Sequence, residues 1–198
     1  MDDPTRHRRA ERQELLAALA PPVQHAVNNF LTVLSGTADI LRRTAKDEAG
    51  AARAGRLAEA AQRIEAVTRA YLTLARRPVP EDAGAELGVT LARLLPLIEI
   101  HLPRGVTVNL SVAPDLPRLA MDASVLDGPL MALLWAAGPE IATRLGLTLT
   151  RGEGGLLLRI EGLPTEADTA PLERAVTAGG GRVAQRGVVL ELALPAEG

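Results

Sequence analysis

The chain has 198 residues, 47% of them hydrophobic, and a formal net charge of −2. This length and apolar content suffice for one large globular domain or two small ones with buried cores. The chain has no cysteine and only three scattered histidines, which excludes disulfides and thiolate metal sites and disfavours a histidine-built metal centre. We therefore expect a protein of the reducing cytoplasm.

The charge distribution and the termini narrow the function classes further. Residues 1–80 hold 13 basic and 9 acidic side chains and the remainder 9 and 15, which indicates two parts. No apolar run approaches the length of a membrane span, and MDDPTRHRRAERQ at the N-terminus has no signal-peptide core. One Phe, one Tyr and one Trp leave little for base stacking. We expect neither a membrane nor a nucleic acid as a partner.

The first part of the chain has helical patterns. Residues 9–20 read RAERQELLAALA, and Pro21–Pro22 should break, kink or restart this helix, which then runs to about Lys46. After DEAG, residues 51–77 repeat apolar side chains at helical spacing. The two helices are expected to form an antiparallel hairpin, followed by the linker RPVPEDAG (77–84).

The second part alternates helix-like and strand-like segments. Apolar runs of helical length predict helices over 87–101 (interrupted near Pro96), 124–137 and 171–178. Alternating patterns predict strands over 106–112 and strand pairs within 147–161 and 182–195. The fold class is therefore α+β. Residues 1–80 are predicted to be a helical hairpin and residues 81–198 an α/β sandwich with one mostly antiparallel sheet.

A polar cluster lies on the helix that follows the proline pair. At 100° per residue, its apolar residues occupy an arc about 100° wide. This predicted core face comprises Val23, Val27, Phe30, Leu31, Leu34, Ala38 and Leu41. His25 lies about 200° around the helix and is expected to face water, with Asn29, Thr32, Gly36, Asp39 and Arg43 beside it.

The composition of this cluster suggests phosphoryl acceptance. A neutral imidazole is a competent nucleophile at neutral pH, and Asn29, one turn after His25, can position a water or a phosphoryl oxygen. The small residues Thr32 and Gly36 leave the surface low enough for another protein to approach. The simpler alternative is that His25 is one more polar surface residue.

The stretch LAPPVQHAVNNFLTVLSGTADILRR resembles the phosphoacceptor helix of bacterial two-component histidine kinases. The resemblance implies that His25 is the phosphoacceptor and Asn29 a positioning residue. It further implies a homodimer in which two hairpins form a four-helix bundle, and response-regulator receiver domains as partners. Thr32, Gly36, Asp39 and Arg43 would form the docking face. Such kinases carry Glu or Asp where this chain has Ala26, which argues against autokinase activity and leaves transfer from an aspartyl phosphate open.

The second part resembles the ATPase-like domain of the same kinases without its nucleotide chemistry. Ala132 and Ala136 replace two asparagines, one of which holds magnesium in such kinases. Gly162 and Pro164 stand where the Asp and first Gly of a nucleotide loop belong, and an ATP lid has no room before the last helix. AGGGR (178–182) is predicted to be a helix C-cap and turn rather than a phosphate loop.

A degenerate ATPase-like domain joined to a phosphoacceptor helix resembles ChpT-like histidine phosphotransferases. We therefore expect a phosphorelay protein that binds no ATP or other cofactor, any Mg²⁺ being supplied by the receiver. Two alternatives stay open: a non-catalytic, pseudokinase-like module that binds a receiver or a kinase, and a receiver phosphatase in which Asn29 orients water. A stable phosphohistidine would distinguish the first function from both alternatives.

Overall fold

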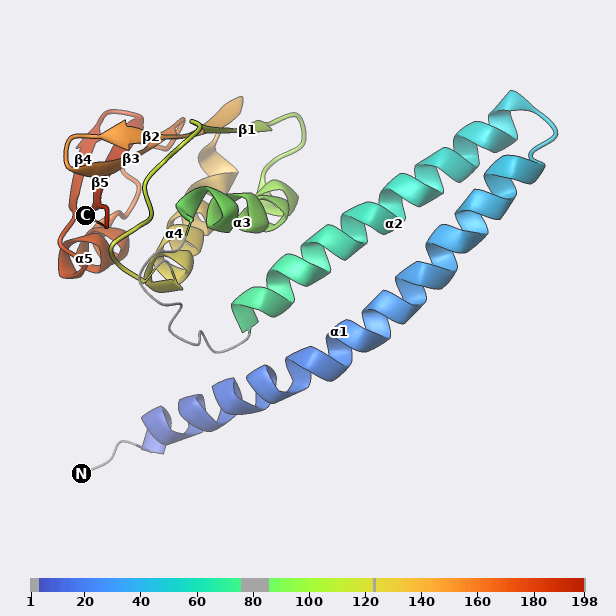
Figure 1. Cartoon of the computed structure of the whole chain (residues 1–198), viewed down its shortest axis with the longest axis horizontal. Coiled ribbons are helices and arrows are strands. Elements are labelled where there is room, and N and C mark those ends of the chain that lie inside the picture. The colour runs from blue at the N-terminus through green and yellow to red at the C-terminus, as the bar shows by residue number, and fades with distance from the viewer. Residues whose placement is uncertain (1–3, 76–85, 123, 198) are drawn as a thin grey trace. The chain divides into compact units, whose positions relative to one another are not determined.

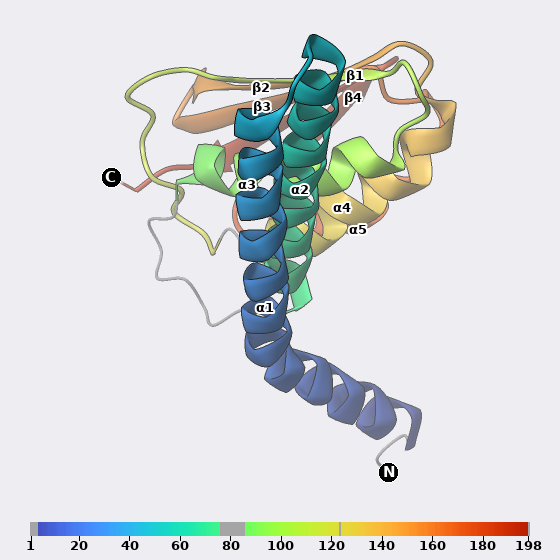
Figure 2. The ribbon, with the colours of Figure 1, turned by 90° about the vertical axis from the view of Figure 1, so that its right-hand side faces the viewer.

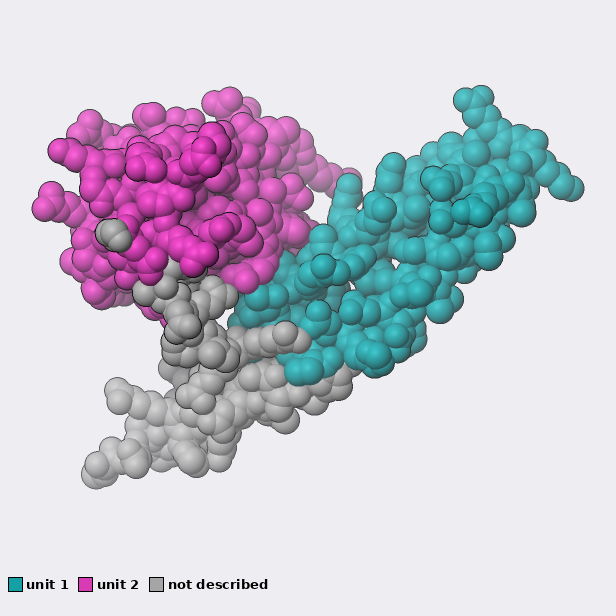
Figure 3. Space-filling view, in the orientation of Figure 1, with its two compact units in different colours: residues 1–77 teal, residues 78–198 magenta. Residues whose placement is uncertain are grey.

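The computed structural model of the chain describes residues 4–75, 86–122 and 124–197. The chain divides into two compact units, Met1–Arg77 and Pro78–Gly198, coloured separately in Figure 3. The predicted linker and the predicted boundary at residue 80 lie outside the described residues. Among the described residues, none of the helices combines the length and hydropathy that a membrane span needs.

The first unit is a hairpin of two long helices, α1 (Pro4–Thr44) and α2 (Glu48–Ala75), which run antiparallel (Figure 1). The predicted hairpin is confirmed. Pro21 and Pro22 neither break nor restart α1, which is continuous through them. Figure 2 shows that α1 instead bends in its N-terminal half, as expected when prolines remove amide donors from a helix.

The turn between the helices is stabilised by Asp47. Its Oδ1 accepts a hydrogen bond from the Gly50 amide at 2.6 Å, and its carbonyl accepts one from the Ala51 amide at 3.2 Å. Asp47 is therefore the N-cap of α2 and satisfies amides that have no partner within the helix. The prediction that the second helix begins at residue 51 was wrong, because DEAG supplies the cap and the first turn.

The two helices bury mainly small side chains against each other. Ala20, Leu31 and Ala38 of α1 and Ala54, Ala61 and Leu72 of α2 are at most 5% exposed. Within the single chain only part of the predicted core face of α1 is buried, because one partner helix covers only one flank of it. The uncovered residues share an apolar character and form what we call the apolar stripe: Val23, Phe30, Leu34, Leu41, Leu57, Ile64 and Tyr71.

The second unit is a two-layer α/β sandwich. Its elements are α3 (Leu87–His101), β1 (Thr107–Val112), α4 (Ser124–Ala137), the 3₁₀ turn Gly138–Glu140, β2 (Arg144–Gly152), β3 (Gly155–Glu161), α5 (Ala170–Ala178), β4 (Arg182–Arg186) and β5 (Val189–Pro195). The strand order is β1-β2-β3-β5-β4, with β1 parallel to β2 and all other neighbours antiparallel. The predicted sandwich with a mostly antiparallel sheet is confirmed.

Two features of this unit differ from the sequence prediction, one inside a helix and one at the start of a strand. Pro96 does not interrupt α3, whose buried leucines continue on both sides of it at Leu94 and Leu97. The second strand begins at Arg144 rather than at residue 147, because β1 pairs with it in parallel from the Thr107–Arg144 position onward. Pairing with β1 thus extends β2 beyond its local sequence signal, whereas α3 keeps its predicted bounds and is continuous through Pro96.

The core of the second unit lies between the sheet and α3, α4 and α5, which cover one face of it (Figures 1 and 2). Along β2, the alternate residues Leu145, Leu147 and Leu149 are at most 1% exposed. The other face carries charges: the Arg159 guanidinium lies 3.4 Å from a carboxylate oxygen of Glu161 and 3.6 Å from one of Glu191. One apolar and one polar face explain the two-layer architecture.

Candidate functional site

The candidate site lies on α1, away from its contact with α2. Among the six predicted site residues, Asp39 is half-buried. The other five are exposed: His25, Asn29, Thr32, Gly36 and Arg43. Helical geometry makes Asn29 the neighbour of His25 one turn later, with Thr32 and Gly36 on the two following turns. The histidine therefore faces solvent at the head of a polar face.

The surface along this face has low relief. A Cβ added at Gly36 would meet no atom within 4 Å, so nothing in the hairpin occupies the space beside it. The Thr32 hydroxyl donates to the Asn28 carbonyl at 2.8 Å and so lies against its own helix. A partner can therefore approach the helix here closely.

The far end of the face carries an ion pair between Asp39 and Arg42. The Asp39 carboxylate accepts a hydrogen bond from the Arg42 guanidinium at 2.9 Å. Both side chains are at least half exposed, so this pair contributes little to stability. The predicted docking role of Asp39 and Arg43 is not affected by this contact.

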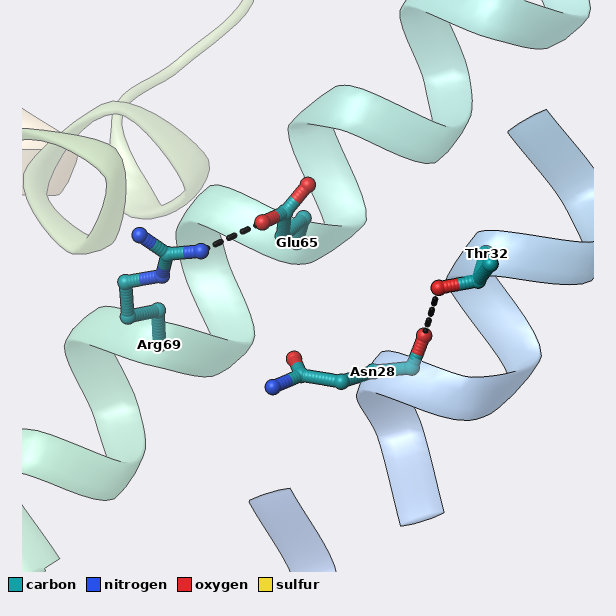
Figure 4. Close-up of polar contacts among 4 residues, drawn as sticks. All are labelled: Asn28, Thr32, Glu65 and Arg69. Carbon is teal, nitrogen blue, oxygen red and sulfur yellow. Dashed lines mark hydrogen bonds and ion pairs between the residues drawn. The ribbon is translucent and has the colours of Figure 1, made fainter. Parts of the chain in front are cut away.

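The structure adds a hollow that the sequence did not predict. It has a volume of about 470 Å³ and is lined by Asn28, Leu31, Thr32 and Ser35 of α1 and by Glu65 and Arg69 of α2. Figure 4 shows the Asn28 side chain extending from α1 toward α2, and the Arg69 guanidinium turned toward Glu65. We call this feature the interhelical hollow.

The interhelical hollow opens on the side of the hairpin that carries His25. Asn28 and Thr32 line it and lie three and seven residues after the histidine, which places all three on one side of α1. The helical spacing of these polar residues can be read from the sequence. The contribution of Glu65 and Arg69 was not, because it depends on the register between the two helices.

The apolar stripe lies on the opposite side of the hairpin. On α1, Phe30 and Leu34 point about 140–180° away from His25. The stripe residues of α2 are rotated from the helix contact in the matching sense, so antiparallel packing brings both rows to one side. The first unit thus has the apolar stripe on one side and His25 with its polar neighbours on the other, where the exposed Val33 and Ile40 flank the polar residues at about 60–80° from His25.

The two alanines compared above with kinase asparagines lie on the surface of the second unit. Ala132 and Ala136 are exposed on α4, and their methyl groups provide no oxygen ligand. Gly162 has a φ of 95°, and a Cβ there would lie 2.2 Å from the Arg144 carbonyl oxygen. Close backbone approach therefore accounts for this glycine without a ligand.

The AGGGR segment is a helix end, as predicted. The Gly179 amide donates to the carbonyls of Ala175 and Val176, and Gly181 donates to Val176 at 2.9 Å. Gly180 has a φ of 83°, a conformation that favours glycine. These amides are occupied by the end of α5, so they are not displayed toward a phosphate.

The other histidine in the described side chains is structural. His101 Nε2 lies 2.6 Å from the Trp135 carbonyl oxygen, and the two rings stack with centroids 3.7 Å apart. This carbonyl belongs to the last turn of α4 and has no partner within that helix. His101 therefore joins the C-terminal ends of α3 and α4.

Comparison with known proteins finds similarity in structure only. No family sequence model matches the chain, and no curated protein matches it. The histidine kinase ThkA, solved in complex with the response regulator TrrA, aligns with a TM-score of 0.50 and 16% identity over 96% of this chain. The alignment spans 65% of the ThkA chain.

Two further histidine kinases align less closely. AdeS of Acinetobacter baumannii has a TM-score of 0.49 at 15% identity, covering 88% of this chain and 98% of its own. The kinase domain of a blue-light-activated histidine kinase from Erythrobacter litoralis has a TM-score of 0.43 at 16% identity, and the alignment covers 85% of this chain and 94% of that domain. The fold comparison therefore rests on the alignment with ThkA, and at 16% identity it concerns the fold alone: a helical hairpin followed by an α/β sandwich.

Proposed function

We propose that the chain is a histidine phosphotransferase of a two-component phosphorelay, in which His25 accepts a phosphoryl group from one receiver aspartate and passes it to another. The observation that carries the proposal is the exposed His25 at the head of the low-relief polar face of α1, with Asn29 one turn later. The hairpin has the fold that presents the phosphoacceptor in histidine kinases. The complex of ThkA with TrrA supports receiver domains as the partner class.

The proposed transfer is balanced in atoms and charge. A lone pair on one imidazole nitrogen of His25 attacks phosphorus, the N–P bond forms, and the O–P bond to the receiver aspartate breaks. The aspartate leaves as a carboxylate, and the other ring nitrogen keeps its proton or releases it to solvent. The reverse sequence, with the carboxylate of a second receiver as nucleophile, regenerates His25. Asn29 can donate its amide hydrogens to the oxygens of the moving phosphoryl group.

We do not expect His25 to be phosphorylated directly by ATP. Ala26 provides no carboxylate beside His25, and Ala132 and Ala136 provide no magnesium ligand on α4. The second unit, residues 81–198 in our domain proposal, is then a degenerate ATPase-like domain with a structural role, of the kind found in ChpT-like proteins. Residues 1–80 form the dimerisation and phosphotransfer domain.

We include a homodimer in the proposal. The apolar stripe runs along both helices of the hairpin and is too extensive to stay in water without cost. Pairing two hairpins through their stripes gives a four-helix core, the usual solution for such a surface. This arrangement leaves both His25 side chains on the outside.

The decisive experiment is incubation with a panel of receiver domains carrying ³²P-labelled aspartyl phosphate. Acid-labile, base-stable label on the wild-type chain, absent from His25→Ala, is the expected result. Release of inorganic phosphate from the receiver without any labelled chain would instead indicate a receiver phosphatase. Binding of the receiver with neither label nor release would indicate a non-catalytic binding module. Either outcome overturns the phosphotransferase proposal.

A further inference from the structure

Arg69 occupies a position that its intrahelical ion pair does not explain. Its guanidinium lies 2.5 Å from a carboxylate oxygen of Glu65, one turn earlier on α2. Both side chains are largely exposed, at 62% and 43%, and exposed pairs of this spacing add little to helix stability. Both residues nevertheless line the interhelical hollow on the His25 side of the hairpin.

The remaining lining of the interhelical hollow is uncharged. Asn28, Thr32 and Ser35 are polar and Leu31 is apolar, so Arg69 carries the only positive charge among the described residues that line it. An aspartyl phosphate that approaches His25 brings about two negative charges, and the departing carboxylate keeps one. The group that reaches this side of the hairpin is therefore an anion in both directions of transfer.

We propose that Arg69 is a positioning residue for the transfer, and that its guanidinium exchanges Glu65 for the anionic groups of the docked receiver's phosphoaspartyl site. This inference rests on the proposed function. The guanidinium is always charged, and its planar array of donors suits phosphate and carboxylate oxygens. Since the pair with Glu65 is exposed and weak, exchanging it for a less solvated anion is favourable. Glu65 holds the guanidinium in the hollow and competes with the receiver for it.

The inference predicts effects of opposite sign at the two residues. Arg69→Gln should lower kcat/KM for labelling of His25 on the order of tenfold and flatten its dependence on salt concentration, since one attractive charge is lost. Glu65→Gln removes the competitor and should raise kcat/KM at low salt. Arg69→Lys keeps the charge and should recover most of the salt dependence. A purely structural ion pair would instead make both glutamine variants lose activity together, in step with loss of helicity.

The matched control is Arg63→Gln. Arg63 is an exposed arginine of the same helix, rotated about 120° from Arg69, and it does not line the hollow. The Arg63→Gln substitution removes the same charge as Arg69→Gln and should change kcat/KM by less than twofold. The donor is a receiver that labels the wild-type chain, assayed between 20 and 300 mM salt, a window of roughly fourfold in Debye length.

The outcomes separate this inference from the proposed function. If no phosphorylated receiver labels the wild-type chain, the proposed function and this inference are both overturned. Labelled wild type with an unchanged Arg69→Gln variant, or with equal losses in the Arg69 and Arg63 variants, would overturn only the role of Arg69. If kcat/KM for labelling fell rather than rose in Glu65→Gln, Glu65 would not compete with the receiver for Arg69. That result would refute the proposed exchange.

Discussion

The dimer proposal is tested most directly by placing a charge in the apolar stripe at Leu34. Leu34 is 40% exposed in the single chain and lies between Phe30 and Leu41 along α1. We expect Leu34→Glu to be a monomer under conditions in which the wild-type chain is a dimer. Glutamate is a good helix former, so α1 itself should persist.

The free energy that dimerisation gains can be estimated from the exposed fractions of the residues in the apolar stripe. Over the seven residues of the apolar stripe these range from 37% for Leu57 to 69% for Phe30. They amount to roughly three and a half whole side chains per hairpin, and burying them contributes about 5–10 kcal/mol per chain. A glutamate in the interface costs about 3 kcal/mol or more in each chain, because its carboxylate loses water without a partner. Two-fold symmetry doubles the cost to about 6 kcal/mol, which weakens the dimer by roughly 10⁴-fold.

The assay is light scattering coupled to size exclusion, from 1 to 100 µM chain. The control is Ala66→Glu, which adds the same carboxylate at an exposed position of α2 on the other side of the hairpin. It should remain a dimer, and circular dichroism should show equal helicity in both variants. A monomer mass for the wild type at 100 µM, or an unchanged dimer in Leu34→Glu, would refute the assignment of the apolar stripe as the interface.

Three further predictions concern the site. His25→Ala should lose all acid-labile label and change the free energy of unfolding by less than about 0.5 kcal/mol, measured by urea denaturation, because the side chain is exposed; residual label would move the phosphoacceptor elsewhere. Titration calorimetry with Mg-ATP should show no binding in the micromolar range, because Ala132 and Ala136 provide no metal ligand; a micromolar dissociation constant would contradict the degenerate-domain proposal. Gly36→Phe should fold and dimerise normally, since a Cβ at Gly36 has open space around it, but should slow labelling of His25 by at least about tenfold by holding the receiver away. Undiminished labelling in that variant would place the docking surface elsewhere.

The fold was largely accessible from the sequence because its elements carry strong local signals. The apolar periodicity placed the helix over 87–101 and the helix over 124–137 at their observed bounds. Two element starts were missed for different reasons. β2 begins early because the distant strand β1 pairs with it, and no local pattern encodes that pairing. α2 begins early because Asp47 caps it, which is a local signal that the prediction overlooked.

The site was accessible only in part, for a related reason. The exposure of His25 follows from helical periodicity within α1, which is local information. The hollow beside it needs the register between α1 and α2, and that register is set by alanines such as Ala38 and Ala61 that allow close packing. The same close packing explains why only part of the predicted core face is buried within one chain. Small residues bring the helices together along a narrow contact, so Phe30 and Leu34 are left outside it.

The proposed dimerisation and the proposed phosphoryl acceptance make compatible demands on this hairpin because they would use opposite sides of it. The apolar stripe and His25 are separated by about 140–180° around α1, so closing the four-helix core neither covers the histidine nor blocks Gly36. A chain in which acceptance depended on the partner subunit would need residues of both hairpins beside each imidazole. Here the neighbours of His25, namely Asn29 and the lining of the interhelical hollow, come from a single hairpin. The Leu34→Glu monomer should therefore still be labelled at His25, at a rate per chain within about threefold of the wild type, provided its helicity is retained. Loss of label in a folded monomer would show that the second hairpin takes part in the site.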